Sequence, residues 1–226
     1  MATSGTVAFR PNIEEIIDES FERCGIETQT RTGGQAVSAR RSLNLLFSEW
    51  SNRGWNYWTL SYQTITLVAD QATYTLTAGL VDIVDVVYRK VSGSTSTDQA
   101  MSRIAIADYN QIPNKTDTGV SSQYMIDRQY TPTMTVWQVP DNTSDSIRYY
   151  GIFQPEDASA MYQDADVPYR WSDAMCAGLA AKLSIKFAPE RSEALIALAE
   201  RSFQFASAEE GSHANLRIKP TGMNLY

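Results

Sequence analysis

Residues 39–58 have the sequence ARRSLNLLFSEWSNRGWNYW, and the character of the chain changes within this stretch. Its first part places apolar side chains on one helical stripe, at Ala39, Leu43, Leu46, Phe47 and Trp50. Gly54 is typical of a helix end, and the aromatic residues after it begin a run of β-favouring types. The stretch therefore predicts a junction at which an amphipathic helix gives way to a β-rich region.

A shorter helix is predicted before this one. Asn12 can cap it, Glu15 follows three residues later as in a capping box, and Gly25 suits a left-handed helix end. Its apolar stripe consists of Ile13, Ile16, Ile17, Phe21 and Cys24. The first 55 residues therefore predict a helical hairpin.

Residues 56–155 are predicted to form an inserted β-rich module of about six strands. The β-favouring runs are separated by turn residues and span 55–68, 72–76, 80–91, 122–130, 133–139 and 146–154. Asp70-Gln71 predicts a hairpin turn, and Ser92–Gln99 an exposed, mobile loop. A short helix is expected over 104–111, with Ser102 as its cap.

Helical spacing returns after the β-rich region. Asp166 is predicted to cap a helix that has Pro168 in its first turn and carries Trp171, Met175, Leu179 and Leu183. Pro189 interrupts the pattern. A last helix is expected to run to about His213, with its apolar stripe at Leu195, Leu198, Ala199, Ser202, Phe205 and Ala206.

The order of these elements predicts an α+β fold. Two N-terminal and two C-terminal helices each need a partner for an apolar face, so we expect them to form one four-helix bundle. The expected parts are 1–55 and 156–213 for the bundle, 56–155 for the inserted β module and 214–226 for an extended C-terminal tail. The aromatic cluster between Trp50 and Trp58 is interpreted as the packed junction between bundle and β module, in preference to a ligand-binding aromatic box.

Composition excludes some classes of function. There are 19 Lys and Arg against 26 Asp and Glu, a formal net charge of −7, which disfavours a protein that grips nucleic acid by its phosphates. No apolar run is long enough to cross a membrane, and the N-terminus lacks the pattern of a secretory signal. Cys24 and Cys176 are expected to be buried free thiols of a protein made in a reducing cytoplasm.

No motif indicates an active site, so we expect no catalytic residue, no cofactor and no metal. His213 is the one histidine, and it is expected to be a solvated residue near a helix end. A zinc site would need Cys or His ligands that the sequence lacks. The acidic residues Glu156, Asp157, Asp164 and Asp166 leave one alternative open, a carboxylate pair that hydrolyses peptidoglycan during infection.

One motif resembles a known family. It comprises Arg40, Arg41, Leu43, Asn44, Trp50, Arg53, Gly54 and Trp55, an Ala-Arg-Arg-x-Leu-Asn core in a helix that ends in Arg-Gly-Trp. Together with residues 108–113 and 167–171, this motif is similar to the head-to-tail adaptors of short-tailed bacteriophages, the group called tail tubular protein A or tail accessory factor. The resemblance extends over the whole order of elements.

The resemblance implies a structural protein of the virion neck that is assembled in the host cytoplasm. It implies a ring of twelve copies between the portal protein and the tail nozzle protein, and double-stranded DNA that passes through the ring without sequence-specific binding. The C-terminal segment would then bind the portal, with anchors at Leu216, Arg217, Ile218, Met223, Leu225 and Tyr226. The β module would contact the nozzle or a neighbouring copy. A nozzle or tail completion protein is the other assembly role left open, and four clear helices count against it.

Overall fold

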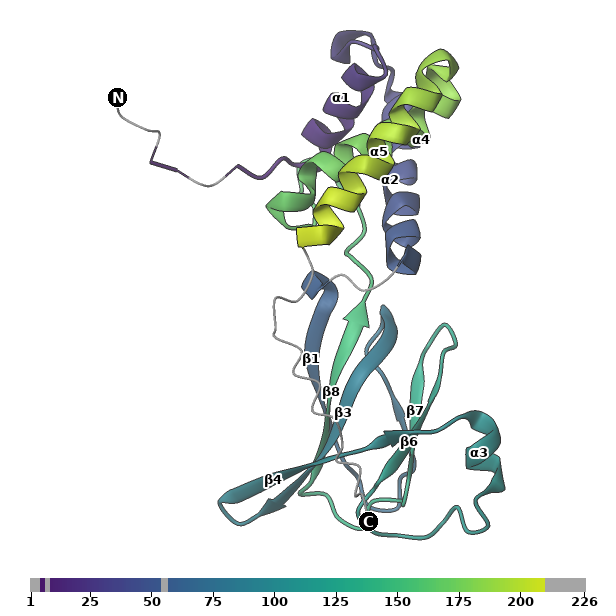
Figure 1. Ribbon diagram of the computed structural model, residues 1–226. Helices are drawn as coiled ribbons and strands as arrows, with labels where there is room; N and C mark the ends of the chain where they lie inside the picture. Colours follow the sequence, from purple (N-terminus) through teal and green to yellow (C-terminus); the bar gives the residue numbers. More distant parts are fainter. Residues whose placement is uncertain (1–4, 7–8, 54–56, 210–226) are drawn as a thin grey trace, which may run out of the picture.

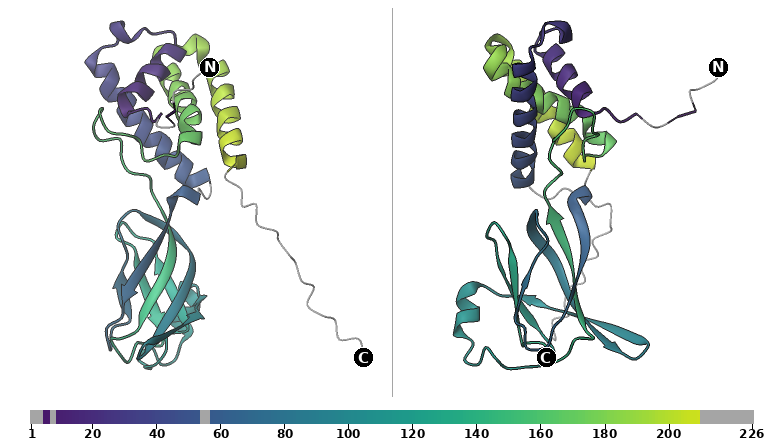
Figure 2. Two further views of the ribbon diagram at one scale, coloured as in Figure 1. Left: turned by 90° about the vertical axis from the view of Figure 1, so that its left-hand side faces the viewer. Right: turned by 180° about the vertical axis from the view of Figure 1, so that it is seen from behind.

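A computed structural model describes residues 5–6, 9–53 and 57–209 of the chain. A helical part and a β-sheet part lie end to end, and the views in Figure 1 and Figure 2 agree on this arrangement. Over the described residues the fold contains five α-helices and two four-stranded sheets. The predicted α+β class is confirmed.

The helical part begins with α1 (Ile13–Arg23), whose start is fixed by the predicted capping box. The side chain of Asn12 accepts a hydrogen bond from the backbone N–H of Glu15, and Glu15 accepts one from the backbone N–H of Asn12, both at 2.9 Å. Two of the otherwise unpaired N–H groups of the first turn are thereby satisfied. Gly25 has a φ of 78° just after the helix, the left-handed conformation that glycine adopts without strain.

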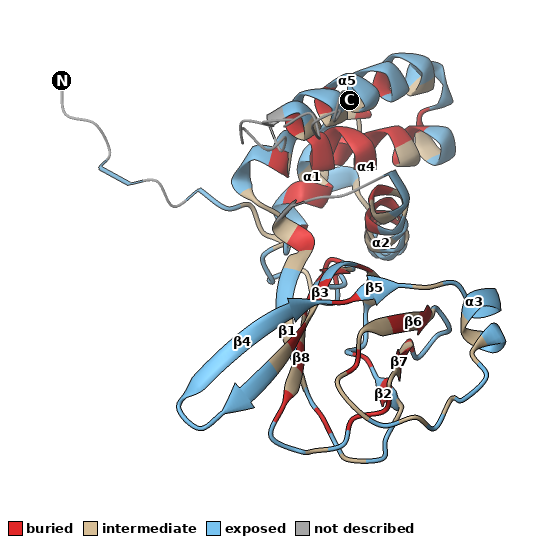
Figure 3. Cartoon of the chain, turned by 60° about the horizontal axis from the view of Figure 1, so that its bottom comes forward, coloured by how far each residue is buried: buried red, intermediate tan, exposed pale blue. Residues whose placement is uncertain are grey.

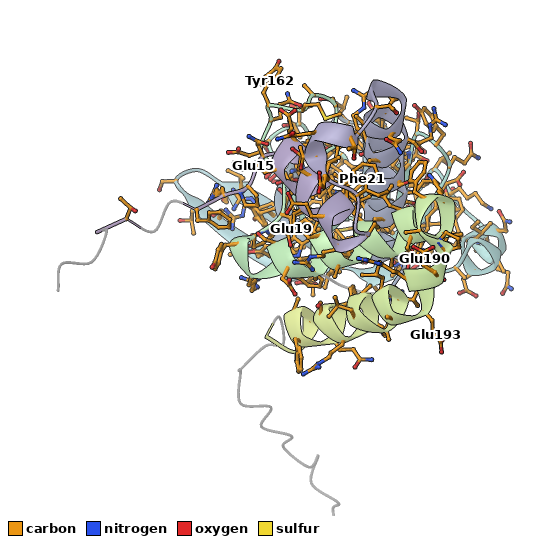
Figure 4. All side chains as sticks on the ribbon, turned by 90° about the horizontal axis from the view of Figure 1, so that it is seen from above. Glu15, Glu19, Phe21, Tyr162, Glu190 and Glu193 are labelled. Carbon is orange, nitrogen blue, oxygen red and sulfur yellow. The ribbon has the colours of Figure 1, made fainter. Side chains whose placement is uncertain are left out.

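Three longer helices pack with α1 around one apolar core. They are α2 (Gly33–Arg53), α4 (Ser172–Phe187) and α5 (Ser192–Glu209). Every residue of the predicted stripes on the first two helices is buried, and so are the four apolar residues predicted for the helix after residue 168. From above, Phe21 points into this core, whereas Tyr162 and Glu193 point away from it (Figure 4).

The β part consists of two facing sheets with a core of their own between them. Their strand orders are β1-β8-β3-β4 and β2-β7-β6-β5. Buried residues from both sheets, including Tyr88 and Tyr149 from one and Ile126 and Met134 from the other, form that second core. The strand bounds are β1 Leu60–Thr66, β2 Thr73–Thr75, β3 Leu80–Ser92, β4 Thr95–Ala100, β5 Ser102–Arg103, β6 Gln123–Asp127, β7 Thr133–Trp137 and β8 Ser146–Phe153.

The expected loop at Ser92–Gln99 is wrong, because most of it is strand. Residues 95–100 form β4, which pairs with the end of β3 from Val87 to Ser92. Gly93 turns the chain with a φ of 61°, as a tight hairpin turn requires at its first central position. Threonine favours the strand conformation, and pairing with β3 completes the hairpin. The segment is polar and shows no alternation of apolar residues, so its sequence does not predict a strand.

Other local predictions are corrected as well. Asp70 lies in a turn with φ 62°, but the turn passes the chain from one sheet to the other, because β1 pairs with β8 and β2 with β7. The short helix α3 (Ile106–Gln111) begins after Ala105, and Ser102 belongs to β5 instead of capping it.

The last two helices also differ from their predicted details. Asp166 does not cap α4; its carboxylate accepts a hydrogen bond from the backbone N–H of Glu156. On α5, Leu198 and Phe205 are exposed, because the buried stripe is narrower than predicted and they lie on its flank. Residues Leu195, Ser202 and Ala206 of the predicted stripe are buried.

Candidate functional site

The polar residues of the family-like motif hold the chain where it returns from the β part. Arg40 donates a hydrogen bond to the carbonyl of Ser159 at 2.5 Å, and the side chain of Asn44 accepts one from the backbone N–H of Ala158 at 2.8 Å. Both contacts join α2 to the irregular segment between β8 and α4. This part of the motif therefore positions the two halves of the molecule relative to each other.

The apolar residues of the motif belong to the helical core. Leu43 and Trp50 are buried, and the Trp50 ring packs at 5.1 Å from that of Trp171 and at 5.9 Å from that of Phe203. Trp58, just before β1, also packs on Trp171, with 6.3 Å between the ring centroids. These aromatic rings pack on one another at the end of α2, as expected of a junction between helical and β parts.

Arg53 closes the joint between α2 and α5. Its guanidinium lies 2.7 Å from a carboxylate oxygen of Glu200 and 2.6 Å from one of Glu49, and it covers the Phe203 ring at 4.8 Å. Lys182 of α4 reaches the other oxygen of Glu49 at 2.7 Å. Burial opposes ionisation of Glu49, but the hydrogen bonds from Lys182 and Arg53 outweigh it and lower the pKa of this carboxyl.

Among the motif residues that the structure describes, Arg41 lies on the outer face of α2. Its side chain is exposed and has no hydrogen bond or ion pair within the described residues. Val37 and Leu45, one helical turn to either side, are 49% and 58% exposed. This outer face of α2 is available to a partner. Gly54 and Trp55 lie outside the described residues, and so do all the predicted portal anchors, Leu216, Arg217, Ile218, Met223, Leu225 and Tyr226.

The four candidate acids lie together but lack the features of a hydrolytic pair. Glu156, Asp157, Asp164 and Asp166 line a hollow of about 250 Å³. All four are exposed, and Asp166 is engaged with the backbone of Glu156. The general acid of a glycoside hydrolase is a carboxyl enclosed in an apolar pocket, whereas these four side chains are exposed. The hollow therefore does not support the hydrolase alternative.

No group of three or more His, Cys, Asp and Glu side chains suited to a metal ion occurs in the parts of the chain that the structure covers. Within the same residues, no helix is long and apolar enough to span a bilayer. Cys24 and Cys176 are free and buried, as expected. Burial raises the pKa of the Cys176 thiol to about 11, which keeps it in the unreactive protonated form at neutral pH.

Sequence reasoning missed Asp145, the most buried carboxylate of the β part, with 2% of its surface exposed. It accepts hydrogen bonds from the Tyr88 hydroxyl and the Val91 backbone N–H, each at 2.7 Å, and from Asn142 at 3.0 Å. Burial opposes its ionisation, but these donors outweigh it and lower its pKa. An isolated aspartate in a turn sequence gives no signal of such a role.

The profile of the SU10 adaptor protein family matches residues 14–217, which include both the helical and the β part. The chain belongs to the SU10 adaptor protein family. Its members are adaptors of the phage head-to-tail kind, so this adaptor is a structural component of a bacteriophage virion that associates with other capsid or tail components. No curated protein matches the sequence of this SU10-family adaptor.

Proposed function

We propose that this adaptor forms a ring of twelve copies between the portal protein and the tail nozzle protein of a short-tailed phage. The observation that carries the proposal is the match of the SU10 adaptor family over residues 14–217, because it spans both parts of the molecule. The motif in α2 further favours the tail tubular protein A group within such adaptors. The role is mechanical, and no catalytic step is part of it.

In this proposal residues 1–55 and 156–213 act as one four-helix bundle that builds the ring. Support comes from the apolar core that α1, α2, α4 and α5 share. Exposed apolar side chains on three of these helices suit contacts with neighbouring subunits, since exposed apolar surface is buried on assembly. They are Val37 and Leu45 on α2, Ile185 on α4, and Ile196, Leu198 and Phe205 on α5.

The C-terminal segment 214–226 is proposed to bind the portal ring. It combines apolar residues with two cations, and it has too few apolar residues to fold alone. Leu216, Ile218, Met223, Leu225 and Tyr226 would be the apolar anchors, and Arg217 would add a charge-assisted contact. The β module 56–155 would face the nozzle protein.

The ring is proposed to extend the DNA channel and to seal it after packaging. Each copy carries a formal charge of −7, so twelve copies make a strongly negative collar. Acidic side chains on the lumen would repel phosphates and let double-stranded DNA slide without sequence-specific binding. A channel lined mainly by Arg and Lys would contradict this part of the proposal.

The test is assembly on portal rings purified from the same phage. Full-length adaptor is mixed with the rings and imaged by electron microscopy, with a chain truncated after Asn215 in parallel. We expect a collar of adaptor density with the full chain and none with the truncated one. The variant Tyr162→Ala, which removes an exposed ring far from the tail in sequence, is the matched control and should bind as the full chain does. Portal binding by the truncated chain would overturn the role of the tail, and failure of the full chain to bind would overturn the proposed function.

A further inference from the structure

A hairpin arm projects from the first sheet. We define the arm as residues 90–100, the end of β3, the turn and β4; every one of these residues is exposed. β3 pairs with β8 only as far as Arg89 opposite Ser146, so the arm continues beyond the body of the sheet. Figure 3 shows it as an exposed ribbon that stands away from the rest of the β part. A two-stranded hairpin without a core is only marginally stable alone, so this arm is suited to gain order from a partner.

The base of the arm is held firmly. Asp145 binds the backbone N–H of Val91 and the hydroxyl of Tyr88, so the buried carboxylate fixes β3 where it leaves the sheet. On the exposed side, Arg89 pairs with Asp98, with 2.6 Å between Nε and Oδ1. The direction of the arm is therefore set by the β part before any partner binds, which lowers the entropy that binding costs.

The two edges of this sheet lack the usual protection. With the order β1-β8-β3-β4, the strands β1 and β4 each have one side that pairs with no other strand among the residues that the structure describes. β1 (Leu60–Thr66) contains no charged residue and no proline. The one charge on β4, Asp98, is neutralised by Arg89. Proteins commonly guard free edges with charges, prolines or bulges against pairing with another chain, and neither of these edges has an unpaired charge or a proline.

We propose that β4 of one copy pairs with β1 of the next copy, so that a single antiparallel sheet crosses each subunit boundary. The inference rests on the proposed ring and names the contact that links its members. The strand directions support it: all three pairings in the sheet are antiparallel, so β1 and β3 run one way and β8 and β4 the other. When neighbours are related by rotation about an axis along the strands, β4 meets the next β1 in antiparallel orientation.

The symmetry and chemistry of the two edges agree with this pairing. β1 and β4 lie at opposite edges of one sheet, and such a head-to-tail contact between different surfaces closes into a ring when the rotation permits. Both strands are rich in Ser and Thr, whose cross-strand pairs are favourable. No like charges meet. An arm laid along β1 would also cover part of the Tyr62 ring, which is 44% exposed and lies tilted against the Tyr150 ring, with 5.0 Å between the ring centroids.

Disulfide trapping tests the pairing. Four positions on the two edge strands lie on the same face of the sheet: Ser96 on β4, and Tyr62, Thr64 and Thr66 on β1. This follows because residues opposite each other on paired strands point to the same face, and so do residues two apart on one strand. Three double variants combine Ser96→Cys with Tyr62→Cys, Thr64→Cys or Thr66→Cys. Within one copy, three strand spacings of about 4.8 Å separate the two edges, too far for a disulfide, which needs Cα atoms about 4.4–6.8 Å apart. A bond can therefore form only between copies.

Each double variant is assembled on portal rings, oxidised and analysed by denaturing, non-reducing electrophoresis. We expect at least one of the three pairs to give a ladder of covalent multimers. The single variants Ser96→Cys and Thr64→Cys, and the pair Ser96→Cys with Arg201→Cys on α5, should give no ladder. The native cysteines are buried and leave the background low.

The outcomes separate the inference from the proposed function. If the copies bind the portal but none of the three pairs forms a ladder, the strand pairing is overturned and the adaptor role stands. If the unmodified chain does not bind portal rings, the proposed function fails and this inference fails with it. A second variant, Ser96→Pro, places a residue without a backbone N–H in the exposed strand β4 and leaves Val91 and Asp145 unchanged, so it should fold. We expect it to bind portal rings with fewer copies or gaps in the collar; a complete collar would overturn the pairing.

Discussion

The helix α2 and the β3–β4 arm are opposites in how their sequences relate to structure. Six residues of α2 are buried, and its spacing of apolar residues follows from packing against α1 and α4. The arm has no buried residue between 90 and 100, and its form follows from backbone pairing. Most of the described motif residues make internal contacts, either within the helical core or, at Arg40 and Asn44, to the segment that returns from the β part. The arm, which we propose to contact the next copy, lies where the sequence shows no motif.

The largest effect on stability is expected for a substitution on the buried face of α2. Trp50→Ala should lower the free energy of unfolding by about 3–5 kcal/mol, because it leaves a cavity among Trp171, Phe203 and Phe47. Leu45→Ala, on the exposed face of the same helix, is the control and should change stability by less than about 0.5 kcal/mol. Urea unfolding followed by tryptophan fluorescence and circular dichroism measures both. Equal losses in the two variants would mean that α2 does not pack as described.

The second largest loss of stability is expected for a substitution at the base of the arm. Asp145→Ala should cost about 2–3 kcal/mol, since the buried Tyr88 hydroxyl and the partly buried Val91 N–H would lose their acceptor. Asp141→Ala, on an exposed neighbour in the same turn, should have little effect. Hydrogen exchange at Val91 gives the local readout, with faster exchange expected in the Asp145 variant alone. An unchanged exchange rate at Val91 in the Asp145 variant would show that Asp145 does not anchor the arm.

A smaller effect is expected at the motif residue Asn44. Asn44→Ala should cost about 1 kcal/mol, because the Ala158 N–H loses a half-buried hydrogen bond of 2.8 Å. Asn52→Ala, at an exposed position about two turns further along α2, serves as the control. Thermal unfolding compares them. A loss as large as that of Trp50→Ala would indicate that the joint between the halves governs the stability of the whole chain.

The smallest effect concerns Glu49 and depends on pH. Its pKa is lowered in the folded state, so its ion pairs stabilise the protein above the ordinary glutamate pKa of about 4.3, and this part of the stability is lost as pH falls through the lower folded value. Glu49→Gln should therefore reduce stability at pH 7 and flatten its decline below pH 4. Because the side chain is partly exposed, we expect less than about 1 kcal/mol. If the free energy of unfolding changed with pH in the same way in the variant and in the original chain, the lowered pKa of Glu49 would be contradicted.

Periodicity predicted the helical part well, and polar segments poorly. The capping box at Asn12 and the buried stripes of α1 and α2 were predictable, because they depend on neighbours within one or two helical turns. The strand β4 was not, since Thr95–Ala100 has no apolar alternation and depends on a partner strand. The flank position of Leu198 on α5 was missed because spacing alone does not say how wide the covered face is.

The sequence by itself determined which segments are helix and which are β-rich, where the chain changes from one to the other, and the resemblance carried by the α2 motif. These are local properties, set by side-chain spacing, caps and β-favouring residue types. Only the tertiary structure decided which strands pair, why Arg40 and Asn44 matter, and that Asp145 anchors an arm with an open edge. Those features join residues far apart in the chain, and long-range pairing leaves no periodic trace in a single sequence.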